Sequence, residues 1–113
     1  MKSPDPKSIL SIDVGRVRVG IAGCDPLGIT ITPLPAIIRG VFNTDLIKLI
    51  DHCVIREVKG LVVGIPLDET GNTTKQSKHC KRYGMKLANA LNLPIALVNE
   101  HSTTWEVKNK LNL

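Results

Sequence analysis

The sequence predicts an α/β fold: a mixed five-stranded sheet, in which a three-strand antiparallel meander is joined by two parallel strands, with helices on both faces. Two observations predict it. Three β-rich stretches follow one another near the N-terminus, separated only by short turns. Beyond residue 40, helical stretches alternate with short apolar strands, which is typical of parallel strands connected by crossover helices.

The first two strands form the hairpin on which the rest of the fold is organised. Ile9–Val14 is almost continuously apolar, as in a strand covered on both sides. After a turn at Gly15, Val17–Ala22 alternates between apolar and polar or small residues, which is the period of a strand with unlike faces. A third strand is expected in Leu27–Pro35, where residues 29–32 are all β-branched, with Pro33 at a sheet edge, where no ladder donor is needed.

The remaining chain predicts crossover units. Asn43 or Thr44 is the expected N-cap of the first helix. Right-handed crossovers place the next strand beside the first one and the last strand beyond it. The expected elements after that helix are a strand at Val58–Gly64, a helix at Lys75–Asn92, a strand at Pro94–Asn99 and a helix at Thr103–Leu111.

Length and composition describe one small domain with a mild preference for anionic partners. The chain has 113 residues, a formal net charge of +5 and 42% hydrophobic residues. It contains no apolar run near the ~20 residues that span a bilayer. Three cysteines without a C-x-x-C pair fit a reducing cytoplasm, so we expect a cytoplasmic location. Residues 1–7 are expected to form a flexible tail.

Asp13 lies in the most apolar strand of the sequence. Desolvating a lone carboxylate costs many kcal/mol, so Asp13 needs a cation. The cation is either an arginine, Arg16 or Arg18, or a bound metal ion.

A second acid is expected at the same edge of the sheet. Ligands bind outside the carboxyl ends of parallel strands, and those ends carry Asp13, the Ile65–Thr74 loop and Glu100. Strands lie about 4.8 Å apart, so backbones two strands apart are separated by roughly 10 Å. A long Glu side chain, or two ions about 4 Å apart, can close that gap. Asp13 and Glu100 are therefore the candidate catalytic and metal-binding residues, and they suit hydrolysis of a phosphodiester with Mg²⁺ or Mn²⁺.

The second helix carries a basic stripe. Lys75, Lys78, Arg82 and Lys86 follow one another at spacings of three and four, so they share one helix face. Such a stripe can contact the phosphate backbone of a nucleic acid without reading its sequence. An ordinary solvated face has the same pattern, and both interpretations stay open.

The loop before this helix is the other candidate contact with nucleic acid. It contains Asp68 and Gly71 but no G-x-x-x-x-G-K-[ST] motif, so a P-loop is excluded. One hypothesis is a mobile loop that closes over bound nucleic acid. The alternative is a plain surface turn rich in Gly, Asn and Asp.

Several separated blocks, taken together in order, resemble a known family. It is the YqgF/RuvX-like family of small bacterial proteins, which have an RNase H-like fold, are akin to Holliday junction resolvases and are described as pre-16S rRNA nucleases. The resemblance extends from Ser8 to the last residue. Its blocks are Asp13-Val-Gly, Arg18-Val-Gly-Ile-Ala, Asp25-Pro-Leu-Gly, Val62-Val-Gly-Ile-Pro-Leu67, Gly71 with Gln76, and Asn99-Glu100 followed by Thr103-Thr104.

The resemblance implies roles for individual residues. Asp13 is similar to the family's first metal-binding carboxylate, Glu100 to the acid of its Asp-Glu-Arg motif, and Arg18 to a basic residue of the second strand. Asn99 and His101 replace the Asp and Arg that usually flank that Glu. The implied function is a Mg²⁺- or Mn²⁺-dependent endonuclease in maturation of pre-16S ribosomal RNA, or a resolvase of four-way DNA junctions.

The family pattern includes a further Asp on a C-terminal segment that this chain does not contain. We therefore expect residues 8–113 to form one RNase H-like domain with an incomplete site. A non-catalytic module that binds nucleic acid is the competing interpretation.

Overall fold

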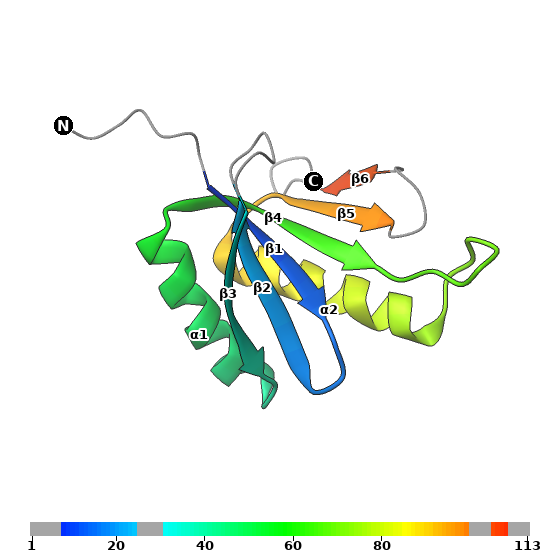
Figure 1. The fold of residues 1–113 in the computed structure, drawn as a ribbon, viewed down its shortest axis with the longest axis horizontal. Coiled ribbons are helices and arrows are strands. Elements are labelled where there is room, and N and C mark those ends of the chain that lie inside the picture. Colours follow the sequence, from blue (N-terminus) through cyan, green and yellow to red (C-terminus); the bar gives the residue numbers. More distant parts are fainter. Residues whose placement is uncertain (1–7, 25–30, 100–104, 109–113) are drawn as a thin grey trace.

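The computed structural model describes residues 8–24, 31–99 and 105–108, and shows a mixed sheet with two helices (Figure 1). The strand order is β3-β2-β1-β4-β5-β6. The elements in chain order are β1 (Ser8–Val14), β2 (Arg18–Cys24), β3 (Ile31–Ile38), α1 (Phe42–Ile55), β4 (Val58–Ile65), α2 (Lys75–Leu91), β5 (Ile95–Asn99) and β6 (Trp105–Lys108).

The strand pairing confirms the predicted mixed sheet. β1 pairs with β2, and β2 with β3, in antiparallel fashion, while β1, β4 and β5 run parallel to one another. β3 lies at the edge, so Pro33 removes no donor that a second neighbour would need. The meander, the two added parallel strands and the edge position of Pro33 are therefore as predicted.

The sheet has one buried face, and both helices pack on it. In β1, Leu10, Ile12 and Val14 are at most 2% exposed, whereas the residues between them point to the other face. α2 packs against β1, β4 and β5, α1 packs against β3 and β4, and the two helices contact each other. The expectation of helices on both faces is wrong for the described residues. We call the face opposite the helices the open face.

A sixth strand replaces the expected last helix. Trp105–Lys108 forms β6, antiparallel to β5, with Val98 opposite Trp105 and Ile95 opposite Lys108. The sequence Trp-Glu-Val-Lys alternates apolar with charged residues and contains two good strand formers, which favours an extended chain. The helix expected at Thr103–Leu111 is therefore absent from residues 105–108, the described part of this segment.

The two helices begin in different ways. At α2, Thr74 and Ser77 form a capping box, in which Ser77 N donates to Thr74 Oγ1 (3.1 Å) and Thr74 N donates to Ser77 Oγ (2.7 Å). α1 follows Val41 without a side-chain cap, so the expected caps Asn43 and Thr44 lie inside the helix. Neither described helix is long and apolar enough to cross a membrane.

Gly84 lets α2 approach the sheet closely. A Cβ at Gly84 would lie 3.0 Å from Val63 Cγ2 and 3.2 Å from Ile95 Cδ1. We predict that Gly84→Val lowers the free energy of unfolding by about 1–3 kcal/mol, because overpacking forces neighbours off their rotamers. Gly40→Ala is the control, since a Cβ there meets nothing within 4 Å. Urea denaturation measures both, and equal stability of Gly84→Val and wild type would contradict this packing.

Candidate functional site

Asp13 is the acid that the structure places on the open face. It is exposed although its neighbours Ile12 and Val14 are buried, because successive residues of a strand point to opposite faces. Gly20 lies opposite Asp13 on β2. A Cβ added at Gly20 would lie 3.5 Å from Asp13 Cβ, which is an ordinary van der Waals contact. In the described part of the chain, no hydrogen bond or ion pair involves the Asp13 carboxylate, so the alternative of a salt bridge to Arg16 or Arg18 is not found. The expected desolvation of Asp13 is also not found, because its side chain is exposed.

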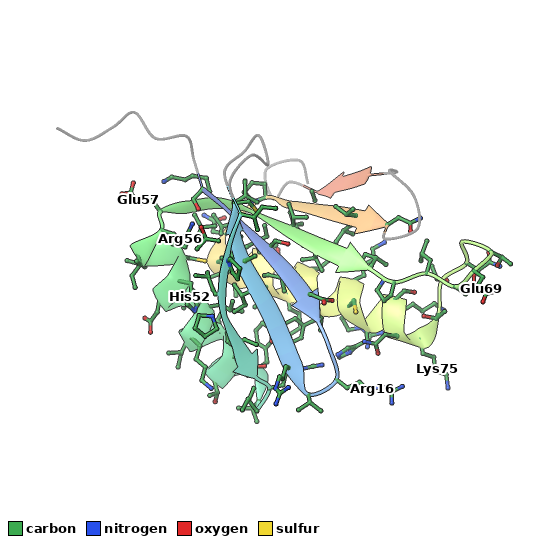
Figure 2. All side chains as sticks on the ribbon, in the orientation of Figure 1. Arg16, His52, Arg56, Glu57, Glu69 and Lys75 are labelled. Atoms are coloured by element: carbon green, nitrogen blue, oxygen red, sulfur yellow. The ribbon has the colours of Figure 1, made fainter. Side chains whose placement is uncertain are left out.

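Arg18 shares the open face with Asp13. It lies two residues from Gly20 along β2, and residues two apart on a strand share a face. Arg16 is exposed in the turn between β1 and β2, at the end of the molecule where α2 begins at Lys75 (Figure 2). The structure thus brings one predicted acidic residue, Asp13, and one predicted cationic residue, Arg18, to the same surface.

Glu100, the other predicted acid, lies outside the described residues. Asn99, which precedes it, ends β5 opposite Ile65 of β4. Since β1, β4 and β5 are parallel neighbours, Asp13 and Asn99 lie toward the same edge of the sheet, on strands whose backbones are roughly 10 Å apart. The described residues contain no group of three or more His, Cys, Asp or Glu side chains that could hold a metal ion.

The basic stripe of α2 is exposed, as predicted. Its four members, Lys75, Lys78, Arg82 and Lys86, are all exposed. Two side chains fix the start of the helix beneath the end of β1: Gln76 Nε2 donates to Val14 O (3.3 Å), and Cys80 Sγ donates to the same oxygen (3.4 Å). The stripe therefore begins next to the strand end that carries Asp13.

Asp68 organises the loop before α2. Its Oδ1 accepts hydrogen bonds from Thr70 N (2.9 Å), Thr70 Oγ1 (2.8 Å) and Asn72 N (2.8 Å). Gly71 has φ +85°, a conformation that glycine adopts without strain. These bonds give the loop a defined turn structure, and they assign Asp68 and Gly71 a structural role within it.

Sequence reasoning missed a buried pair. Asp45 is 1% exposed, and its carboxylate accepts hydrogen bonds from Tyr83 Oη (2.8 Å) and Gly40 N (2.9 Å). Burial, together with the bond to Asp45, raises the pKa of Tyr83. The signal was present in the sequence, because Asp45 stands between Phe42 and Leu49 on the inner stripe of α1, where an apolar residue is expected.

Comparison with known sequences places the chain beside one family. A sequence model described as "RuvX: Holliday junction resolvase" matches residues 7–113. A "Putative pre-16S rRNA nuclease" of Synechococcus sp. (strain CC9902) is 61% identical over 102 residues, which are 90% of this chain and 62% of that protein. A protein of the same name from Prochlorococcus marinus (strain MIT 9313) is 56% identical over 110 residues, which are 97% of this chain and 68% of that protein.

Comparison with solved structures concerns the fold alone. The structure titled "T. thermophilus RuvC in complex with Holliday junction substrate" superposes with a TM-score of 0.60 and 10% identity, over 84% of this chain and 66% of that one. A structure of Thermus thermophilus RuvC gives a TM-score of 0.57, also with 10% identity, over 81% of this chain and 63% of that one. The likeness confirms the predicted RNase H-like fold. The chain spans 62% of the length of the Synechococcus relative.

The Asp68 turn predicts a pH dependence of the loop. Hydrogen bonds from Thr70 and Asn72 lower the pKa of Asp68 below its usual value. A depressed pKa means that the turn is stabilised above the ordinary pKa of Asp and loses this support as the pH falls through the lowered one. We expect the amide resonances of Thr70 and Asn72 to move together in this acidic range in an NMR titration. A pH-dependent shift of these two resonances near pH 4 or above, without a parallel change at Asp68, would contradict this role.

The buried pair predicts a stability change. Tyr83→Phe removes the hydroxyl that donates to Asp45 and leaves a buried carboxylate oxygen without that donor. We expect the free energy of unfolding to fall by about 1–3 kcal/mol, the typical penalty for an unsatisfied buried group. Asp45→Asn tested alone and combined with Tyr83→Phe completes a double-mutant cycle. Additive effects of the two changes would contradict a direct interaction.

Proposed function

We propose, from the premise that this chain belongs to the RuvX family, that it is a metal-dependent nuclease domain that cleaves phosphodiesters in structured nucleic acid. One observation carries the proposal: the Asp13 carboxylate is exposed at the carboxyl end of β1, on the open face, with no hydrogen-bond or ion-pair partner among the described residues. The name of the relatives favours pre-16S ribosomal RNA as the substrate, and hence a cytoplasmic location.

Asp13 fits a hard divalent cation. Mg²⁺ and Mn²⁺ prefer carboxylate oxygens and are held in such sites by one or two carboxylates, with water and substrate oxygens completing the shell. We assign Asp13 and Glu100 as the two carboxylates. The bound ion would stabilise charge on the phosphate oxygens during hydrolysis.

The chain's own cations position the substrate in this proposal. Arg18 lies on the open face with Asp13, and the stripe of Lys75, Lys78 and Arg82 begins beneath the end of β1. Contacts with phosphates fix the orientation of a nucleic acid without reading its sequence. The loop ordered by Asp68 and Gly71 immediately precedes the stripe, so it would lie beside the same nucleic-acid strand that the stripe contacts.

Branched DNA is the second candidate substrate. The description of the matching family model, which names Holliday junctions, favours it. Binding without cleavage is the third outcome.

Cleavage should depend on Asp13. We predict that Asp13→Asn lowers the rate of Mg²⁺- or Mn²⁺-dependent cleavage roughly 100-fold or more, because loss of partners outside the ligand shell already reduces activity by 10–100-fold. Asp51→Asn, which neutralises an exposed acid of α1, is the matched control. A pre-16S RNA fragment and a four-way DNA junction, tested in parallel, distinguish the substrates. Equal rates for Asp13→Asn and wild type would contradict the assignment.

The basic stripe should set the salt dependence of binding. Each phosphate contact contributes about 0.7–0.9 to the slope of log affinity against log salt concentration. We therefore expect the double variant Lys78→Glu and Arg82→Glu, in the Asp13→Asn background, to reduce that slope by the contribution of about two phosphate contacts. The control reverses Lys48 and Lys59, two exposed lysines outside the stripe, so that the net charge changes equally. An unchanged slope in the stripe variant would remove α2 from the interface.

A further inference from the structure

A basic pocket lies on the helix side of the sheet, opposite the open face that carries Asp13. It has a volume of about 180 Å³ and lies between the start of α1, the segment that leads into it, and the middle of α2. A single water requires only about 10–15 Å³ of such volume. The pocket is therefore large enough for a small ligand group. Its polar lining is Arg39, Asp45, His79, Arg82, Tyr83 and Lys86.

The charge of this lining is positive. Arg39, Arg82 and Lys86 carry three positive charges, and Asp45 is the one carboxylate among the residues that line the pocket. Asp45 is almost fully buried, and its oxygens already accept hydrogen bonds from Gly40 N and Tyr83 Oη. In the described part of the chain, no ion pair joins this carboxylate to the three cations. The cations therefore keep their charge available to a ligand.

Two of the cations are held in place. Arg39 Nη1 donates to Gly15 O (2.7 Å), and its guanidinium lies 4.8 Å from the centroid of the Tyr83 ring. Lys86 Nζ lies 4.1 Å from the centroid of the Phe42 ring. A guanidinium has five donors and an ammonium has three, so both groups retain free donors after these contacts. Preorganised cations bind an anion with less loss of side-chain freedom than mobile surface lysines do.

His79 responds to the same field. Burial, and then the nearby Arg39 and Arg82 charges, lower the pKa of His79. Its surroundings are Arg39 from the segment before α1, Asp45 from α1, and Arg82, Tyr83 and Lys86 from α2. Arg39 and Arg82 repel the protonated form of His79. An anion bound between the cations would offset this repulsion and raise the pKa of His79.

We propose that this pocket binds a phosphate group. Arginine forks and lysine ammonium groups are the side chains that bind phosphate oxygens through charge-assisted hydrogen bonds. Arg39 ties the pocket to the turn between β1 and β2, through Gly15 O and through its own N–H to Val17 O (2.8 Å). The phosphate comes either from a nucleic-acid strand that also passes the turn or from a free nucleotide. The proposal does not require Asp13 or cleavage.

The test is an NMR titration of the full chain in the Asp13→Asn background, with sodium chloride at matched ionic strength as the salt control. The probes are inorganic phosphate, a 5′-mononucleotide and a short single-stranded RNA. We expect each binding probe to shift the amides of Phe42 and Tyr83, which line the pocket and lie outside the stripe, and to raise the pKa of His79. The double variant Arg39→Gln and Lys86→Gln should bind roughly 10- to 100-fold more weakly, whereas Lys48→Ala, outside the pocket, should bind like its parent.

The outcomes separate the sources. If RNA shifts the pocket resonances with a higher affinity than the mononucleotide does, the ligand is a phosphate of a nucleic-acid strand. A response to phosphate and mononucleotide without a response to RNA identifies a free phosphate ligand. No shift beyond that of sodium chloride, or equal affinity in the double variant, overturns the proposal. RNA cleavage by the parent chain without any pocket response would leave the nuclease proposal intact and exclude this site.

Discussion

The two-residue period of β1 is the constraint on which the rest of the structure depends. Ile12 and Val14 are held in the core, where α2 packs on β1, so Asp13 between them must face the other way. A shift of one residue would bury the carboxylate and expose the apolar side chains, at a cost of several kcal/mol. The hydrophobic core therefore fixes the position of the acid, and the hairpin to β2 places Arg18 on the same face.

The sequence predicts the parts of the fold that local patterns determine. The hairpin follows from alternation around Gly15. The buried face of α2 also follows from a local pattern, because Cys80, Tyr83 and Leu87 recur at helical spacing and are all buried. The placement of both helices on one face is a tertiary property, and no local pattern reveals it. At Trp105–Lys108 the strand alternation was present in the sequence, but pairing with β5 is what makes that segment a strand.

The candidate site was predictable to a lesser degree. The exposure of the α2 stripe follows from helical spacing. The expectation of a desolvated Asp13 in a strand covered on both sides is wrong, because β1 is covered by helices on one face only and Asp13 is exposed on the other. The partner of a charged side chain depends on contacts between distant residues. Asp45 finds Tyr83, 38 residues away, and Arg39 finds Gly15, 24 residues away. Such pairs arise only when the helices pack on the sheet. The basic stripe indicated two cations of the basic pocket, Arg82 and Lys86, but no local pattern indicated that Arg39 joins them.

The central claim is that Asp13 holds a divalent metal ion on the open face. Titration of the chain with Mn²⁺, followed by paramagnetic broadening of amide resonances, tests it most directly because it needs no substrate. The account predicts saturable broadening of Asp13, Gly20 and Arg18 in the wild-type chain and its loss in Asp13→Asn. Broadening that persists unchanged in Asp13→Asn, or that centres on other residues, would contradict it.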